Sequence, residues 1–278
     1  MAKNNEKVTT LGDLERSDQD LLIKNRLAKI KRKILVMSGK GGVGKSTVAA
    51  YLAMILAEQG FQVGLLDVDL HGPSIARLMN ARSGLQMPEG GGVKPYPYSD
   101  HLGVVSMEMV MGDKDTAVIW RGPLKISAIR QFISDIEWGN LDFLIVDSPP
   151  GTGDEPLTVA QTIPDAEALI ITTPQEISLA DVRKSINFCR QVKMKILGLV
   201  ENMSGFVCPH CGEKLPIFGM GGGERMAKDM DVPLLAQIPI NPLMVERSDR
   251  GELNQMLKDK DSDINKAYED IVKHLEVS

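Results

Sequence analysis

The chain has 278 residues, of which 43% are hydrophobic and 25% charged, and its formal net charge is −5. These values are typical of a folded protein of one or two domains, and they exclude a disordered, collagen-like or disulfide-scaffold chain. The acidic balance argues against a permanent nucleic-acid binder, the first residues lack the apolar core of a signal peptide, and no apolar run approaches the ~20 residues of a membrane span. We therefore expect a cytoplasmic protein without a nucleic-acid or membrane partner.

Residues 1–33 are polar and charged, and their scattered leucines predict a helical lead-in of one or two helices. From residue 34 onward, short aliphatic runs alternate with stretches of helical period. The runs predicted as strands are 34–38, 63–68, 104–107, 143–147, 168–173, 196–200 and 234–238. The predicted helices lie near 45–59, 123–137, 178–193, 221–230 and 262–275. Two segments, 80–101 and 203–223, are predicted as irregular excursions.

The alternation of strands and helices indicates the fold class. Several runs are apolar nearly throughout, as expected for strands covered on both faces. Strand–helix alternation predicts right-handed crossovers and a mostly parallel sheet with helices on both sides. We therefore predict an α/β protein, a three-layer sandwich in a single domain over 34–278, preceded by the lead-in at 1–33.

A glycine-rich segment directly follows the first predicted strand. It matches the phosphate-binding pattern G-x-x-x-x-G-K-[ST] between a strand and a helix. Its backbone N–H groups can surround phosphate oxygens, and the following helix adds the positive end of its dipole. Its second lysine would neutralise the β- and γ-phosphates, and the next hydroxyl would bind Mg²⁺. We predict an ATP–Mg²⁺ site formed by Gly39, Lys40, Gly41, Gly42, Val43, Gly44, Lys45, Ser46 and Thr47.

Three carboxylates follow predicted strands. Asp67 and Asp69 lie at the end of the second run, and Asp147 ends the fourth. Each alone could be a helix cap or a turn residue. Because parallel strands end at one edge of a sheet, where ligands bind, all three are expected beside the phosphate loop. Asp147 fits the aspartate that holds Mg²⁺, often through a water molecule.

Lys40 adds a feature that the general pattern does not require. The stretch from Gly39 to Ser46 resembles the deviant phosphate loop of the partition, arsenite-pump and nitrogenase-iron-protein ATPases, in which the extra lysine reaches across a dimer to the partner's nucleotide. Further stretches are similar to one subfamily, the Mrp/ApbC-type iron–sulfur carrier ATPases. These stretches are 67–74, 120–123, 147–154, 201–206, 208–211 and 218–223, so the resemblance covers about residues 28–275.

The resemblance implies roles for individual residues. Lys40 and Lys45 would act on the nucleotide phosphates, and Asp69 would polarise the attacking water. Asp67 and Asp147 would support Mg²⁺, and residues 147–154 would form the switch that senses the γ-phosphate.

The same resemblance implies a base site and a cellular role. Asn202 would hydrogen-bond the adenine, and Pro239 would lie near the base. The chain would be a homodimeric carrier whose slow ATPase is coupled to passing a [4Fe–4S] cluster to apo iron–sulfur proteins. Relatives often carry an extra N-terminal module, for which residues 1–33 are too short, so its function is not transferred.

Cys208 and Cys211 form a C-x-x-C pair. A tetrahedral metal or [4Fe–4S] site needs four ligands, and the remaining Cys189 lies in a predicted helix among apolar residues, where it is expected to pack. Two chains together would supply four thiolates around a two-fold axis. Three interpretations stay open at this point: a [4Fe–4S] cluster bridging two subunits, a bridging Zn²⁺ and a redox dithiol. His210, between the cysteines, is expected to be a bystander.

An alternative of another class is a spatial-organisation ATPase of the MinD/ParA type that binds DNA or membrane. Its membrane-binding members end in a basic amphipathic helix. The predicted last helix here has one apolar face, but its other face is rich in acidic residues, which favours docking on its own domain. Electron transfer as in the nitrogenase iron protein is disfavoured, because the cysteines of that protein are far apart in sequence.

Overall fold

The computed structural model describes residues 11–70, 72–81, 85, 92–111, 122–208, 210–260 and 262–277. Within these ranges nine strands form one sheet, in the order β3-β4-β2-β5-β1-β6-β7-β8, with β9 also paired to β7. The strands are β1 (Ile30–Ser38), β2 (Val63–Asp67), β3 (Tyr96–Ser99), β4 (Leu102–Ser106), β5 (Leu141–Asp147), β6 (Glu167–Thr172), β7 (Lys195–Val207), β8 (Lys214–Leu215) and β9 (Leu234–Ile240). All pairs are parallel except β3 with β4 and β7 with β8.

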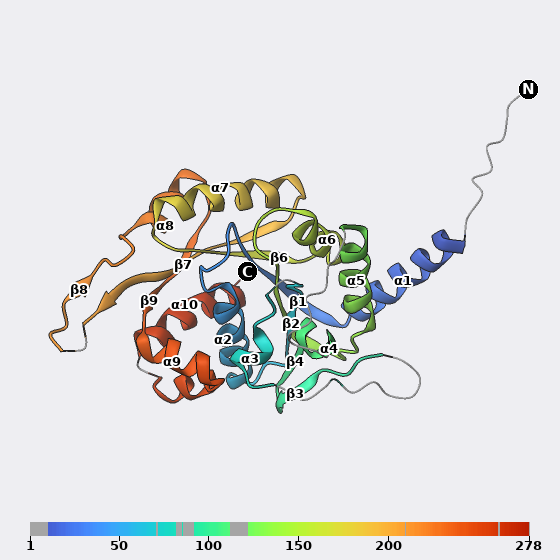
Figure 1. The fold of residues 1–278 in the computed structure, drawn as a ribbon, viewed down its shortest axis with the longest axis horizontal. Helices are drawn as coiled ribbons and strands as arrows, with labels where there is room; N and C mark the ends of the chain where they lie inside the picture. Colours follow the sequence, from blue (N-terminus) through green and yellow to red (C-terminus); the bar gives the residue numbers. More distant parts are fainter. Residues whose placement is uncertain are drawn as a thin grey trace, which may run out of the picture.

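Helices cover both faces of this sheet (Figure 1). Those in contact with one core are α2 (Lys45–Glu58), α3 (Ile75–Leu78), α9 (Pro242–Arg250), the 3₁₀ helix η1 (Leu253–Lys258) and α10 (Asp263–Val277). Those in contact with the other are α1 (Leu11–Leu27), α5 (Gly122–Asp135), α6 (Asp154–Thr162), α7 (Glu176–Gln191) and α8 (Gly222–Asp229). The short helix α4 (Met107–Met111) follows β4 directly.

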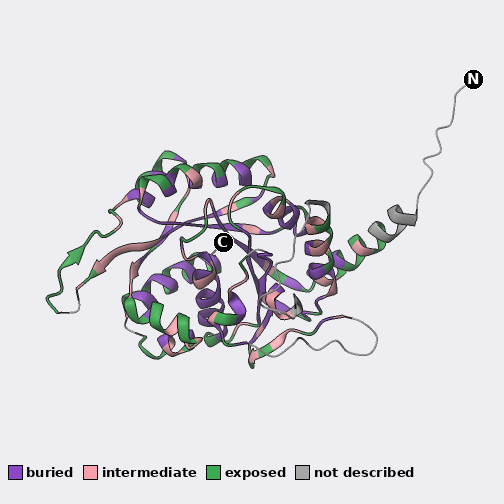
Figure 2. Ribbon diagram, viewed as in Figure 1, coloured by how far each residue is buried: buried purple, intermediate pink, exposed green. Residues whose placement is uncertain are grey.

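The two cores follow from the alternation of side chains along each strand. On β1, Ile34 and Val36 belong to the core with α2, whereas Leu35 and Met37 belong to the core on the opposite face. Successive side chains of a strand point to opposite faces, so an entirely apolar strand serves both cores. Figure 2 shows the buried strands between helices whose outer faces are exposed. The predicted three-layer α/β sandwich with a mostly parallel sheet is confirmed.

The structure differs from the sequence expectations in the excursions and at several boundaries. Part of 80–101 forms strand β3, an edge strand that contains Pro97 and therefore lacks one donor for pairing. The segment 203–223 is not irregular throughout, since β7 continues to Val207 and pairs with β8 as a hairpin. The first strand begins at Ile30, inside the predicted lead-in. The helices α3, α4, α6 and α9 were not predicted.

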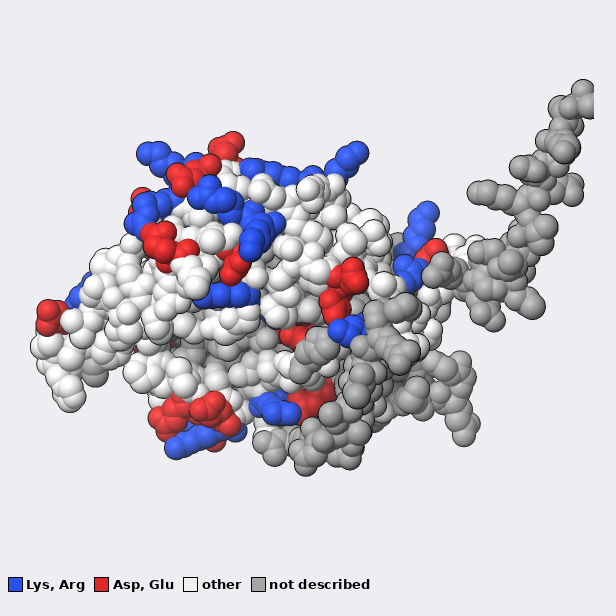
Figure 3. Space-filling view, turned by 45° about the horizontal axis from the view of Figure 1, so that its top comes forward, with Lys and Arg blue, Asp and Glu red and all other residues white. Residues whose placement is uncertain are grey.

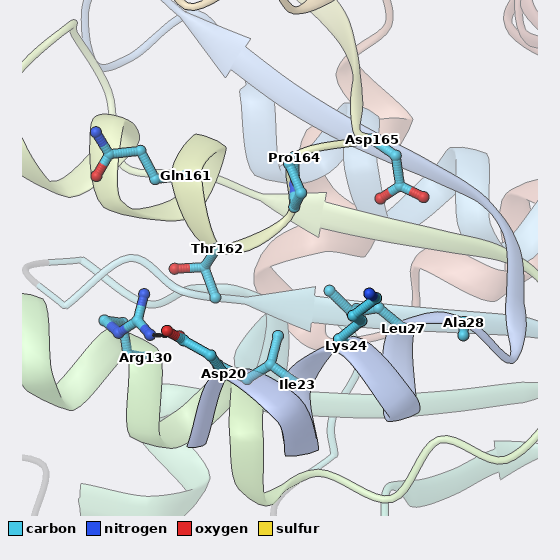
Figure 4. A pocket seen from close by; sticks show the side chains of 10 residues that line it. All are labelled: Asp20, Ile23, Lys24, Leu27, Ala28, Arg130, Gln161, Thr162, Pro164 and Asp165. Carbon is cyan, nitrogen blue, oxygen red and sulfur yellow. Dashed lines mark hydrogen bonds and ion pairs between the residues drawn. The ribbon is translucent and has the colours of Figure 1, made fainter. Parts of the chain in front are cut away.

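Helix α1 packs against α5 through an ion pair between Asp20 and Arg130, and its residues Ile23 and Leu27 are buried. A cavity of about 570 Å³ lies beside it, lined by α1, Arg130, the last residues of α6 and the turn that follows α6 up to Asp165 (Figure 4). Because that turn immediately precedes β6, the cavity lies at the amino edge of the sheet, opposite the edge at which the phosphate loop follows β1.

Candidate functional site

The phosphate loop joins the end of β1 to the start of α2. Gly42 and Gly44 have φ angles of 79° and 80°, a backbone conformation that glycine adopts without steric cost. The Ser38 hydroxyl donates to the Lys40 carbonyl oxygen at 2.9 Å, which ties the loop to the strand. The predicted strand–loop–helix context of this motif is therefore present. Thr47 lies in the first turn of α2, after Ser46.

Lys45 and Asp147 form a buried ion pair across the site. The distance from Lys45 Nζ to Asp147 Oδ1 is 2.5 Å, and the two side chains are 6% and 0% exposed. Asp147 Oδ2 is buried without a hydrogen-bond partner. Burial raises the pKa of Asp147, and the positive charge of Lys45 opposes that shift. An unsatisfied carboxylate oxygen beside the phosphate loop is the donor type that Mg²⁺ prefers, so these residues fit a nucleotide-bound Mg²⁺.

Asp67 lies directly beside Asp147, because the two residues pair in register at the ends of β2 and β5. Its carboxylate accepts hydrogen bonds from the Ser106 hydroxyl at 3.0 Å and from the backbone N–H groups of Asp69 and Ser74, each at 3.1 Å. Burial and the neighbouring charge of Asp147 raise its pKa to about 7. Asp69 is also buried, and its Oδ1 accepts from the Gly72 N–H at 3.1 Å. The three predicted carboxylates therefore share one edge of the sheet.

The segment after Asp147 runs alongside the end of β1, just before the phosphate loop. The Gly151 N–H donates to the Ser38 carbonyl at 2.8 Å, and the Ser148 N–H donates to the Val36 carbonyl at 3.2 Å. Asp154, the end of the predicted switch, is the first residue of α6. The predicted switch segment therefore lies between the end of β1 and the start of α6.

Asn202 reaches the phosphate loop from β7. Its Nδ2 donates to the Val43 carbonyl oxygen at 2.8 Å, and a Cβ placed on Gly44 would overlap that same nitrogen. Pro239 lies on the neighbouring strand β9, one residue beyond the partner of Asn202, Ile238, and lines a cavity of about 350 Å³. The two residues predicted for the base are therefore on adjacent strands.

The cysteine pair occupies the end of the β7–β8 hairpin. The Cys208 N–H donates to the Glu213 carbonyl and the Gly212 N–H donates to the Cys208 carbonyl, both at 2.9 Å. Cys208 is partly exposed and Cys211 is exposed. Hydrogen bonds from the Cys211 and His210 backbone lower the pKa of Cys208, which favours the thiolate that binds metals.

The hairpin supplies only part of a metal site. Within the described ranges, no group of three or more His, Cys, Asp and Glu side chains is arranged to hold a metal ion. Cys189 is buried in α7, where burial raises its pKa to about 12, in keeping with a packing role. Figure 3 shows few charged side chains on the projecting hairpin except near its tip.

Two polar residues of this region were not singled out from the sequence as candidates for the site. Ser106 ends β4 and donates to Asp67; its place after an aliphatic run was the available signal. Glu201 is fully buried on β7 beside Asn202, and a carboxylate closing an apolar strand was again the signal. Three stretches of the resemblance include His71, Trp120–Arg121 and Pro209, which lie outside the described residues.

The alternative of a membrane-binding ATPase finds no support in the last helix. The apolar face of α10 is buried against its own domain, and its residues Tyr268 and Ile271 are about 1% and 0% exposed. Among the described residues, none of the helices combines the length and the apolar character that crossing a bilayer requires.

Several known proteins are similar to this chain over most of its length. The iron-sulfur cluster carrier protein of Methanocaldococcus jannaschii is 48% identical over 236 residues, which are 84% of this chain and 81% of that protein. A cytosolic Fe-S cluster assembly factor NUBP2 homolog of Dictyostelium discoideum is 51% identical over 229 residues, 80% of this chain and 86% of that protein. The nucleotide-binding protein of Archaeoglobus fulgidus, solved in complex with ADP, is 40% identical, covers 85% of this chain and 93% of its own, and superposes with a TM-score of 0.75.

The family model described as ParA, the NUBPL iron-transfer P-loop NTPases, matches residues 29–276. That range includes the phosphate loop, the three carboxylates and the cysteine hairpin, and leaves out only α1 with the residues around it and the two terminal ends. The phosphate loop and the three carboxylates at the ends of β2 and β5 form what we call the nucleotide edge of the sheet. Because the match spans nearly the whole chain and includes this edge, the chain belongs to the NUBPL iron-transfer P-loop NTPases of the ParA family.

Proposed function

We propose that this chain is an iron–sulfur cluster carrier that binds and hydrolyses ATP and passes a [4Fe–4S] cluster, its cargo, to apo iron–sulfur proteins. The observation that carries the proposal is the layout of β7: Asn202 on this strand contacts the phosphate loop, and Cys208 comes directly after the strand. One element thus joins the phosphate loop to a cysteine pair of which Cys208 is partly exposed and Cys211 exposed. We place the carrier in the cytosol, as the name of the Dictyostelium relative does for that protein.

Two copies are required to complete the cluster site. The hairpin provides two thiolates, a [4Fe–4S] cluster takes four, and one described chain gathers no further ligands around them. A homodimer with the two hairpins facing each other across a two-fold axis would supply the full set. Lys40, which is partly exposed in the loop, would then face the partner's nucleotide.

We assign the nucleotide chemistry to the residues at the carboxyl edge. The loop from Gly39 to Gly44 would hold the phosphates with its N–H groups. Lys45 would break its ion pair with Asp147, and its positive charge would then neutralise the β- and γ-phosphate oxygens. Ser46, with Asp147 and Asp67 behind it, would hold Mg²⁺, which supplies Lewis-acid polarisation of the phosphates when bound.

Hydrolysis needs a group that orients the attacking water. Asp69 lies two residues beyond Asp67 and is held by the Gly72 N–H at 3.1 Å, so its carboxylate faces the same edge. It would accept a hydrogen bond from the water and direct its lone pair at the γ-phosphorus. The switch from Asp147 to Asp154 would register loss of the γ-phosphate through the bonds of Ser148 and Gly151 to β1.

Anaerobic reconstitution with iron and sulfide tests the cluster proposal. We expect about four iron atoms per dimer and a broad visible absorption band, because four thiolates complete one cluster. Cys208→Ala and Cys211→Ala should each lose the band. The matched control is Cys189→Ala, the same chemical change at a buried cysteine in α7, which should keep it.

Three outcomes would contradict this proposal. They are a band that persists in both hairpin variants, a monomer that holds a full cluster, and protein purified without oxygen that contains zinc in place of iron. The last result would support the bridging Zn²⁺ that uses the same thiolates.

A further inference from the structure

Strand β7 carries a buried carboxylate, Glu201, to which none of the roles above refers. Its side chain is 0% exposed. Its Oε1 accepts from the Ser204 hydroxyl at 2.5 Å and from Gln237 Nε2 at 2.9 Å, and its Oε2 accepts from the Gly223 N–H at 2.5 Å. All three partners are uncharged. We call these four residues the Glu201 clamp.

A buried carboxylate is costly unless its oxygens are hydrogen-bonded. The three donors of the clamp come from three elements: Ser204 from β7 itself, Gln237 from β9, and Gly223 from the first turn of α8. The positive end of the α8 dipole adds to the stabilisation of the negative charge. Since satisfying Glu201 requires all three elements in place, the clamp ties them into one unit.

The glycine run before α8 is explained by this contact. A Cβ on Gly223 would lie 2.8 Å from Glu201 Oε2 and 2.9 Å from Glu201 Cβ. A Cβ on Gly222 would overlap the backbone carbonyl of Pro174 in the loop after β6. Only glycine permits α8 to approach β7 closely enough for its N–H to reach the carboxylate.

The clamp also holds a bulge in β7. Asn202 pairs with Ile238 of β9 and Phe206 pairs with Ile240, so three residues of β7 (203–205) lie opposite one residue of β9. Met203 and Gly205 have φ angles of 57° and 79°. Bulges of this kind bend a strand and change the direction of the chain beyond them. Ser204, at the centre of the bulge, is the residue bonded to Glu201.

The hairpin that carries the cysteines comes immediately after this bulge. Phe206 and Val207 pair with β8, and Cys208 is the next residue. Figure 1 shows this hairpin projecting from the body of the domain beyond β7. Asn202 lies on the other side of the bulge and contacts the phosphate loop.

We propose that Glu201 is a positioning residue for the cysteine pair, an inference that rests on the proposed carrier function for its biological meaning. By holding the bulge against α8 and β9, Glu201 sets the direction in which the hairpin leaves the sheet, and so the separation of the four thiolates in a dimer. Asn202, its neighbour on β7, lies before the bulge and contacts the phosphate loop through its own side chain, which makes no hydrogen bond to the clamp within the described part of the chain. Loss of Glu201 therefore loosens the hairpin and leaves nucleotide binding intact.

The test uses the full chain without cluster and compares four single variants and one double variant. Glu201→Gln keeps the size but turns one acceptor into a donor that faces other donors. Gly223→Ala places a methyl group against the carboxylate from the opposite side. Ser204→Ala removes one donor and is the mildest change. Glu213→Gln is the matched control, because it makes the same chemical change in the same hairpin at an exposed side chain outside the clamp.

Three measurements separate a positioning role from a general structural role. Hydrogen exchange of the amides at 203–207 should quicken about tenfold or more in Glu201→Gln and Gly223→Ala, because a buried acceptor or donor is left unsatisfied. The alkylation rates of Cys208 and Cys211 should change in parallel, with a smaller change in Ser204→Ala. ADP affinity, measured by calorimetry, should stay at the wild-type value, and Glu213→Gln should match wild type throughout. The double variant Glu201→Gln/Gly223→Ala should be no looser than either single variant, since both break one contact.

Unchanged exchange at 203–207 in Glu201→Gln and Ser204→Ala would overturn the inference, even if Gly223→Ala fails to fold. Two other results would also overturn the inference. One is faster hydrogen exchange spread evenly over the whole domain, and the other is a loss of ADP affinity as large, in free energy, as the loss of exchange protection at 203–207. Because these measurements use protein without cluster, they are independent of the cargo. Wild-type protein that binds no iron would contradict the proposed function but not the role of the clamp. Protein that binds a cluster but shows unchanged exchange at 203–207 in the clamp variants would contradict the role of the clamp but not the proposed function.

Discussion

Gly44 offers a test of how the phosphate loop and β7 fit together, because a second glycine of the same loop serves as its control. Gly42 and Gly44 have nearly the same φ, 79° and 80°. A Cβ on Gly42 would have no neighbour within 4 Å, whereas a Cβ on Gly44 would overlap Asn202 Nδ2. Substitution by alanine thus imposes the same backbone strain at both positions and adds a collision at only one.

The two expected costs differ by one contact. A side chain in the left-handed region costs ~1–2 kcal/mol, which both Gly42→Ala and Gly44→Ala would lose in stability. Gly44→Ala also displaces Asn202 and breaks its 2.8 Å hydrogen bond to the Val43 carbonyl, worth about 1 kcal/mol. We therefore expect Gly44→Ala to be less stable than Gly42→Ala by about 1 kcal/mol.

Urea unfolding without nucleotide measures both costs, so that phosphate binding does not enter the comparison. The double variant Gly44→Ala/Asn202→Ala supplies the second arm: the bond is already absent in it, so the two substitutions should be non-additive by about 1 kcal/mol. Equal losses for the two glycine variants, or strict additivity in the double variant, would refute the reasoning.

Two further predictions concern stability. Glu167 pairs with Arg32 and Lys195, and although burial opposes it, these partners lower its pKa. The contribution of Glu167 to the free energy of unfolding is therefore full above the unfolded-state pKa of ~4.3 and is lost as pH falls through the lower folded-state pKa. The difference in stability between wild type and Glu167→Gln should therefore shrink on acidification. A difference of constant size from neutral pH to about pH 3 would contradict this. Tyr51→Phe removes the hydroxyl that donates to Asn265 at 2.5 Å but keeps the edge-on contact with the ring of Tyr268. Thermal unfolding should show a loss of ~1–3 kcal/mol in the free energy of unfolding, because the Asn265 oxygen is left without its donor. An unchanged melting temperature would contradict this prediction.

The nucleotide edge was largely predictable because its signals are local. The spacing of glycines and lysine in 39–45 is set by the geometry of a phosphate and a helix start, and both are short-range properties of the chain. The carboxylates Asp67 and Asp147 were placed beside the loop by one general rule, that parallel strands end at a common edge. Their register, one directly opposite the other, is confirmed by the pairing of β2 with β5.

The cysteine hairpin was less predictable because its structure depends on pairing. Gly205, Pro216 and the glycines after it favour turns, so the sequence indicated an irregular loop. The pairing of Phe206 with Leu215 and of β7 with β9 turned part of that loop into strand. Glu201 carried one local signal, a carboxylate after an apolar run, but no local pattern predicted that α8 and β9 would pack against it.

Periodicity and motif spacing, which act within about one turn or one strand, were enough to predict the layers, the phosphate loop and the pair of thiolates. The donors that satisfy Glu201, the bulge at 203–205 and the contact of Asn202 with Val43 became visible only when distant segments packed together. Those contacts join segments up to 159 residues apart in the sequence. Their free energy depends on how these segments pack in the folded chain, which cannot be predicted from the residues next to each other in the sequence.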